Sequence, residues 1–99
     1  SARCLAERMF SHDKNELKQA IIFGYQLSTG RLPKPAELDI MENTHANFLA
    51  HYTAKPAEAN LLLAMGETQR DQTIPVVEHA AMTMLANILL NLDETISKE

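Results

Sequence analysis

The chain has 99 residues, the length of one domain, and its 45% hydrophobic and 22% charged residues are typical of a folded globular protein. The net charge of −4, with nine scattered basic residues, argues against nucleic acid as a partner, because phosphate backbones are bound by clustered lysines and arginines. No apolar run is long enough to span a membrane, and the single cysteine, Cys4, excludes an internal disulfide or a CxxCH haem attachment.

Helical periodicity begins at the N-terminus. A first, short helix is predicted over about residues 2–10. A second helix is predicted over about residues 13–29, because Asp13 followed three residues later by Glu16 fits a capping box. The apolar faces of the two helices are predicted to be Cys4, Leu5, Met9 and Phe10 in the first, and Leu17, Ala20, Ile21, Gly24, Tyr25 and Leu27 in the second.

Two glycines have predicted roles in the second helix. Gly24 is costly inside a helix, by about 1 kcal/mol relative to alanine, so we expect it to allow close approach of a neighbouring helix. Gly30 stands where a left-handed residue would end the helix. The segment "RLPKP" that follows predicts a rigid connector.

A third, long helix is predicted over about residues 35–54, because Pro35 suits a first helical turn and Pro56 ends the pattern. Its apolar face is Leu38, Met41, His45, Phe48, Leu49 and Tyr52. The segment "PAEANLLLAMG" predicts a short fourth helix that stops at Gly66.

The fifth helix is predicted to begin near Thr73 to Pro75, after a polar loop. Its apolar stripe is Val77, Ala81, Met84, Leu85, Ile88 and Leu92, with Ala80 and Leu89 beside it. Asn91 and Asp93 are poor interior helix residues and predict the helix end. We expect the stripe to dock between the other helices; packing on a preceding domain is the alternative.

Together these elements predict an all-α fold, a compact bundle of about five helices, two of them short, with mostly antiparallel neighbours. Residues 1–99 are predicted to form a single helical domain. The opening "SARCLAERMF" is already helical in pattern and has no initiator methionine, which predicts a C-terminal fragment of a longer chain.

Candidate chemistry is sparse. Glu42 and His45 form E-x-x-H on the third helix, a spacing that faces a metal in di-iron bundles, where two such motifs and further carboxylates are needed. With one motif present, they are weak metal candidates, and a half-buried histidine beside a carboxylate is the simpler interpretation. His12, His51 and His79 are predicted to be solvated, with His51 near Lys55 or Glu58. No catalytic residues and no cofactor-binding residues are predicted.

Two stretches carry a family resemblance. The C-terminal stretch "AMTMLANILLNLDETISKE" and the stretch "QAIIFGYQLSTGRLPKPAEL" resemble the uncharacterised helical C-terminal region of secreted, multi-domain planctomycete proteins that carry a cytochrome-c-like domain. The matching residues are Tyr25, Leu27, Gly30, Arg31, Pro33, Pro35, Glu37, Leu38, Leu85, Leu89, Leu90, Asn91, Leu92, Asp93, Glu94 and Ile96. The loop 66–73 is hard to place against the family.

The resemblance implies an exported protein, periplasmic or at the cell surface, with any haem in another domain and no cofactor in this fragment. It implies a non-catalytic helical module that packs on its own upstream domains or on a protein partner. The alternative is part of an enzyme whose active site lies mainly upstream, with Arg31, Glu42 and His45 as contributors if they converge on a pocket. A third hypothesis is a free-standing ligand or metal binder.

Overall fold

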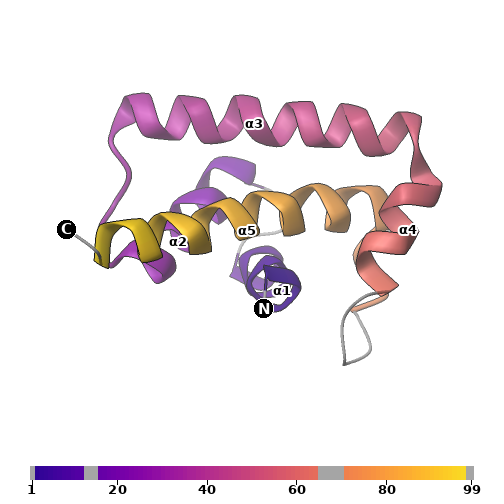
Figure 1. The fold of residues 1–99 in the computed structure, drawn as a ribbon, viewed down its shortest axis with the longest axis horizontal. Coiled ribbons are helices and arrows are strands. Elements are labelled where there is room, and N and C mark those ends of the chain that lie inside the picture. Colours follow the sequence, from indigo (N-terminus) through magenta and orange to yellow (C-terminus); the bar gives the residue numbers. More distant parts are fainter. Residues whose placement is uncertain (1, 13–15, 65–70, 98–99) are drawn as a thin grey trace.

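The computed structural model describes residues 2–12, 16–64 and 71–97, with side chains described as far as residue 92. These residues form five helices and no strand (Figure 1). The helices are α1 (Ala2–His12), α2 (Leu17–Thr29), α3 (Pro35–Ala54), α4 (Pro56–Ala64) and α5 (Val76–Ser97). The predicted all-α bundle of about five helices is confirmed. None of the described helices combines the length and the apolar character that crossing a membrane requires.

Helix α5 is the central element of the bundle and packs against each of the other four helices. It runs antiparallel to α3, whereas α1 is seen almost along its axis and crosses α5 steeply (Figure 1). All five residues from 79 to 83 are buried, so this part of α5 has no solvent-facing side. A helix that is buried all round belongs in a core, which explains why the final helix is so hydrophobic.

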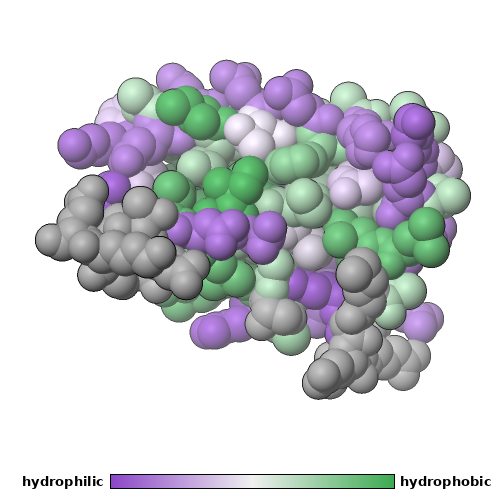
Figure 2. All heavy atoms as spheres, viewed as in Figure 1, coloured by the Kyte–Doolittle hydropathy of each residue, from purple (hydrophilic) through white to green (hydrophobic). Residues whose placement is uncertain are grey.

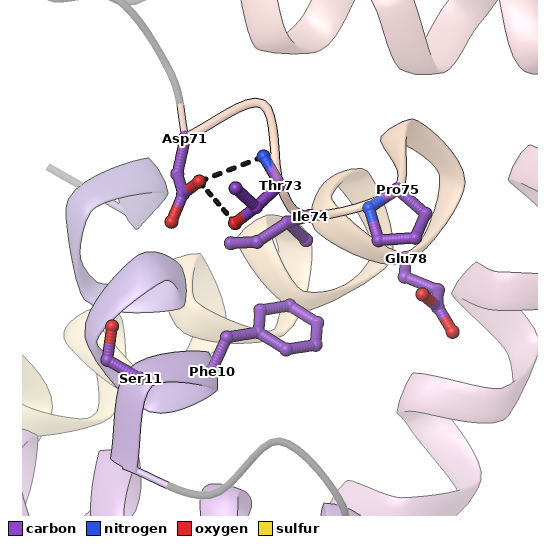
Figure 3. Close-up of a pocket in the computed structure, with 7 residues that line it drawn as sticks. All are labelled: Phe10, Ser11, Asp71, Thr73, Ile74, Pro75 and Glu78. Carbon is purple, nitrogen blue, oxygen red and sulfur yellow. Dashed lines mark hydrogen bonds between the residues drawn. The ribbon is translucent and has the colours of Figure 1, made fainter.

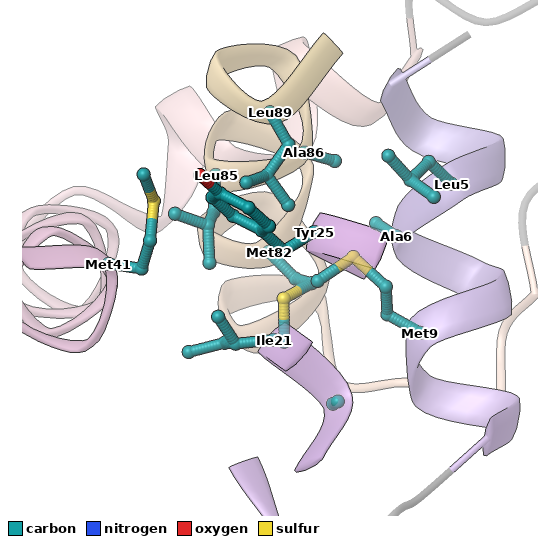
Figure 4. Packing of buried hydrophobic residues seen from close by; sticks show 11 residues of the cluster. Leu5, Ala6, Met9, Ile21, Tyr25, Met41, Met82, Leu85, Ala86 and Leu89 are labelled. Carbon is teal, nitrogen blue, oxygen red and sulfur yellow. The ribbon is translucent and has the colours of Figure 1, made fainter. Parts of the chain in front are cut away.

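The main core cluster joins α5 to three other helices (Figure 4). Its largest members are Leu5 and Met9 of α1, Ile21 and Tyr25 of α2, Met41 of α3, and Met82, Leu85 and Leu89 of α5. A second cluster, Tyr52, Ala59, Leu63, Ala80 and Ala81, joins α3 and α4 to the first half of α5. The prediction that the stripe of the last helix docks between the other helices is therefore confirmed. The Cα radius of gyration, 12.9 Å, matches the ~13 Å expected for a folded domain of about 100 residues.

Two helix ends differ from the sequence-based expectation. Helix α2 begins at Leu17, and Glu16 is its extended N-cap residue, so the predicted capping box of Asp13 and Glu16 is wrong. Asp13 itself lies outside the described residues, as does Gly66. Helix α5 continues to Ser97, so Asn91 and Asp93 do not end it. Packing of a long apolar stripe outweighs the weak helix propensity of these residues.

The predicted buried faces are correct for their central residues and wrong for some of the residues at their edges. Leu17 and Leu27 are 39% and 43% exposed, while Ser28 is buried in their place. Cys4 is exposed, whereas Arg3 and Ala6 of the same helix are buried. Met82 and Ala86 of α5 are buried although they lie outside the predicted stripe, because α5 has neighbours on every side.

The two glycines have the predicted roles. Gly24 is buried where α1 and α2 meet, and a Cβ atom there would lie 2.5–2.9 Å from three atoms of Met9. Gly30 has a φ of 79° and follows the last residue of α2, and its N–H donates to the Gln26 carbonyl at 2.9 Å. Both predictions are confirmed.

Candidate functional site

The connector between α2 and α3 is held by several polar contacts. The Arg31 guanidinium donates to both oxygens of Glu37, from Nη1 to Oε1 at 3.0 Å and from Nη2 to Oε2 at 3.1 Å. The same Glu37 Oε1 accepts the Lys34 backbone N–H at 2.8 Å. Such a planar two-point pairing fixes orientation as well as distance. We call residues 30–37 the braced turn.

The braced turn is anchored to the core beneath it. The Arg31 guanidinium carbon lies 5.2 Å from the ring centroid of Tyr25, within the range of a cation–π contact. Tyr25 is 1% exposed and belongs to the main core cluster. Pro33 and Pro35 restrict φ on the far side of the turn. The turn is thus rigid although most of it is exposed.

Hydrogen bonding and burial change the pKa of ionisable groups in and beneath the braced turn. Hydrogen bonds from the Arg31 side chain, and then from the Lys34 backbone, lower the pKa of Glu37 from 4.5 to about 2. Burial raises the pKa of Tyr25, and the neighbouring Glu37 carboxylate raises it further. The carboxylate therefore remains ionised, and keeps its pairing, down to strongly acid pH.

Large apolar side chains are exposed around the braced turn. Leu32 is 60% exposed, Leu27 at the end of α2 is 43% exposed, and Ile40 in α3 is 59% exposed. Figure 2 shows apolar surface, in green, lying between polar side chains on the face formed by α3 and α5. The turn therefore presents apolar groups on a fixed backbone.

The sequence motif that carries the family resemblance maps to two places. Gly30, Arg31 and Pro33 lie in the braced turn, as part of the structure just described. Leu89 is buried, Leu92 half-buried and Asn91 exposed on the last turns of α5. The side chains of Asp93 and Glu94 lie outside the described residues. Figure 1 places the α2–α3 connector and the C-terminal end of α5 at the same end of the molecule.

The weak metal candidates lie in different surroundings. His45 is 6% exposed on the inner face of α3, and burial lowers its pKa, while the charge of Glu78 opposes this shift. Glu42 is half-buried. Within the described ranges, no group of three or more His, Cys, Asp or Glu side chains is placed to hold a metal ion. Metal binding by Glu42 and His45 stays a prediction.

A buried charged cluster was missed by the sequence analysis. Glu7 Oε2 lies 3.4 Å from His79 Nε2 and accepts the Asp71 backbone N–H at 3.1 Å. Arg3 Nη1 donates to the Leu63 carbonyl near the end of α4 at 3.1 Å, and Arg3 Nε lies 3.9 Å from Glu7 Oε2. The prediction that His79 is solvated is wrong, since His79 is completely buried.

The cluster of Arg3, Glu7 and His79 ties α1 to α4 and α5. A completely buried imidazole is out of reach of a substrate, so the geometry assigns the cluster to folding. The spacing of Arg3 and Glu7, four residues apart, could have indicated their pairing. Nothing in the sequence indicated His79, because its partner lies at the other end of the chain. By contrast, His51 is exposed as predicted and lies 2.8 Å from Glu58.

A pocket of about 250 Å³ lies between the end of α1 and the segment that precedes α5 (Figure 3). Its lining residues are Phe10, Ser11, Asp71, Thr73, Ile74, Pro75 and Glu78. Arg31, Glu42 and His45, the residues proposed for an upstream active site, do not line it. Arg31 is instead engaged in the braced turn, so these three residues do not converge on this pocket.

Comparison of the chain with protein families, with curated proteins and with solved structures gives no match.

The pairing of Arg31 with Glu37 predicts that part of the stability of the fold depends on pH. Because the pKa of Glu37 in the fold is about 2, below its ordinary 4.5, the stabilisation from this carboxylate is complete above about pH 4.5 and is lost as the pH falls toward 2. In Arg31→Gln we expect the pKa of Glu37 to rise most of the way to its ordinary value. The pKa of Glu37 in the unchanged protein and in the variant is measured by following its carboxyl carbon chemical shift by NMR as the pH is varied. An unchanged pKa in the variant would contradict the assigned pairing.

Proposed function

We propose that this chain is a non-catalytic helical module that packs through its braced turn on upstream domains of its own longer chain or on a protein partner. The observation that carries the proposal is the combination of a rigid turn with apolar exposure. Leu32 lies in the braced turn, Ile40 lies next to it in α3, and each is about 60% exposed. The backbone of the turn is fixed by the pairing of Arg31 with Glu37.

A turn that is both rigid and exposed is suited to binding another protein surface. Ordering a flexible loop on binding costs free energy, and a turn that is already fixed avoids most of that cost. Exposed leucine and isoleucine side chains supply apolar surface, and the fully buried core of an interface is more apolar than the rest of a protein surface. Arg31, with its planar guanidinium at the rim, is of a residue type enriched in interfaces.

The resemblance to exported, cytochrome-carrying planctomycete proteins adds a finer proposal. In that setting the module would be exported with its parent protein, and any haem would lie in another domain. Gly30, Arg31 and Pro33 of the braced turn belong to the matching stretch.

The test uses the protein purified from its source cells. A photo-crosslinking amino acid replaces Leu32 in one variant, Ile40 in a second, and Leu61 in a control. Leu61 is 69% exposed on α4, at the opposite end of the molecule from the turn (Figure 1). We expect crosslinks to upstream segments or to a partner from positions 32 and 40, and none from position 61.

Two results would contradict the proposal. Equal crosslinking from positions 32 and 61 would mean that the turn is not the contact surface. A native protein with a mass near 11.1 kDa, with neither a bound partner nor haem absorbance, would overturn the finer proposal as well.

A further inference from the structure

Helix α3 is held on the bundle by few buried side chains. Of its 20 residues, only Met41, His45 and Tyr52 are buried, whereas every residue of α5 from 79 to 83 is buried. Figure 1 shows α3 as an outer helix that runs along one edge of the molecule, beside α5. One of the three buried side chains that attach this helix is therefore an ionisable imidazole.

His45 lies between the two core clusters. Met41 belongs to the main core cluster and Tyr52 to the second cluster, and all three side chains share one face of α3. Each end of α3 has a further anchor, because Glu37 pairs with Arg31 at the N-terminal end and Tyr52 packs with α4 at the other. The middle of the helix therefore depends on His45 more than its ends do.

The charged groups around His45 do not offset the effect of its burial. Burial lowers the pKa of His45 from its ordinary 6.5, and the charge of Glu78 on α5 opposes this shift without cancelling it. Glu42, one turn earlier on α3, is half-buried. Three helices pack against α3, and their other ionisable side chains described are Lys18 and Tyr25 of α2, Glu58 of α4 and His79 of α5. Within the described ranges, Glu78 is the one charged group that acts on the pKa of His45.

The burial of His45 links the contact between α3 and α5 to pH. When α3 leaves α5, the imidazole is hydrated and regains its ordinary pKa of 6.5. The opened state then binds more protons than the packed state, so the stability of the contact is complete above about pH 6.5 and falls as the pH decreases below it. Glu37 stays ionised in this range, because its pKa is about 2, and the braced turn keeps its pairing.

We propose that α3 is an acid-sensitive cover on α5, and that protonation of the His45 imidazole opens the contact between the two helices while α1 and α2 remain packed on α5. Opening withdraws Met41 and Tyr52 from the two clusters and exposes the α5 side chains that they cover. The cover acts through the inner face of α3 and does not depend on the contact role proposed for the braced turn.

The test is amide hydrogen exchange of the whole chain, followed by NMR at about pH 7.5 and about pH 5.5. Each rate is divided by the rate of an unstructured peptide at the same pH, which gives the opening constant of the segment that carries the amide. Because a helix detached from its support is marginal in water, the amides of α3 exchange when the helix opens.

We expect the opening constant of α3 to exceed that of α2 at both pH values, and to rise by about threefold to tenfold at the lower pH. Tenfold is the ceiling, because the lower pH lies about one unit below the ordinary pKa of 6.5. Equal constants in α2 and α3 would overturn the proposal, because α3 would then leave only when the whole fold unfolds.

Two histidine variants isolate the cause. His45→Gln removes the ionisable ring from the inner face of α3, and His51→Gln removes one from the exposed face of the same helix. We expect the rise in the opening constant to disappear in His45→Gln and to persist in His51→Gln. A rise that survives in His45→Gln would overturn the proposal, and His45→Met replaces this variant if glutamine prevents folding. The imidazole NMR signal of the unchanged protein gives a second readout, since a His45 pKa at or above 6.5 would also overturn the proposal.

Discussion

Replacing Leu85 with alanine will lower the free energy of unfolding by about 2–5 kcal/mol, the range measured for fully buried leucines. Leu85 is 0% exposed and lies in the main core cluster, on the side of α5 that meets α1, α2 and α3. Truncation removes the apolar contacts and leaves a cavity that helices fixed on three sides cannot close. Urea denaturation followed by far-UV circular dichroism measures the loss.

Leu90 provides a matched control on the same helix. It is 39% exposed, so Leu90→Ala removes little buried surface, and we expect a loss of no more than about 1 kcal/mol. Helix propensity hardly distinguishes the two variants, because both replace leucine with alanine inside α5. Losses of similar size at the two positions would show that α5 is a peripheral helix, against the arrangement in Figure 1.

The contrast between these leucines shows what the sequence could predict about the fold. Periodicity placed Leu85 on the buried stripe and Leu89 beside it, and α3 begins and ends where Pro35 and Pro56 predicted. A periodic stripe predicts only one buried face, however, whereas α5 is buried on several sides. The burial of Met82 follows from the position of α5 among four neighbours, which is a property of the whole chain.

The candidate site was predictable only where its contacts are local. Gly30 and the rigid connector were read from the sequence, and Arg31 and Glu37 are close enough along the chain to pair across it. The two hydrogen bonds from Arg31 to Glu37, and the position of Arg31 over the Tyr25 ring, depend on the direction in which α3 leaves the turn. The pocket lies between α1 and the segment before α5, which are far apart in the sequence, so no local sequence pattern could predict it.

Gly24→Ala will destabilise the fold by about 1–2 kcal/mol, although alanine is the better helix former by about 1 kcal/mol. The new Cβ would lie 2.5 Å from Sδ, 2.7 Å from Cε and 2.9 Å from Cγ of Met9. The end of a methionine side chain can usually move aside. Met9 is 0% exposed and packed in the main core cluster, so its movement must displace other core side chains.

A double-mutant cycle with Met9→Ala tests this cause directly. Met9→Ala removes all three clashing atoms, at its own cost of about 2–5 kcal/mol. In that background Gly24→Ala should become stabilising, by up to about 1 kcal/mol, because only the gain in helix propensity remains. Gly30→Ala is the contrasting case. No atom of the described residues is found within 4 Å of its Cβ position, and its cost of about 1–2 kcal/mol comes from the positive φ. Met9→Ala should therefore leave the cost of Gly30→Ala unchanged, and a Gly24→Ala cost that also survives Met9→Ala would show that close packing against α1 is not its cause.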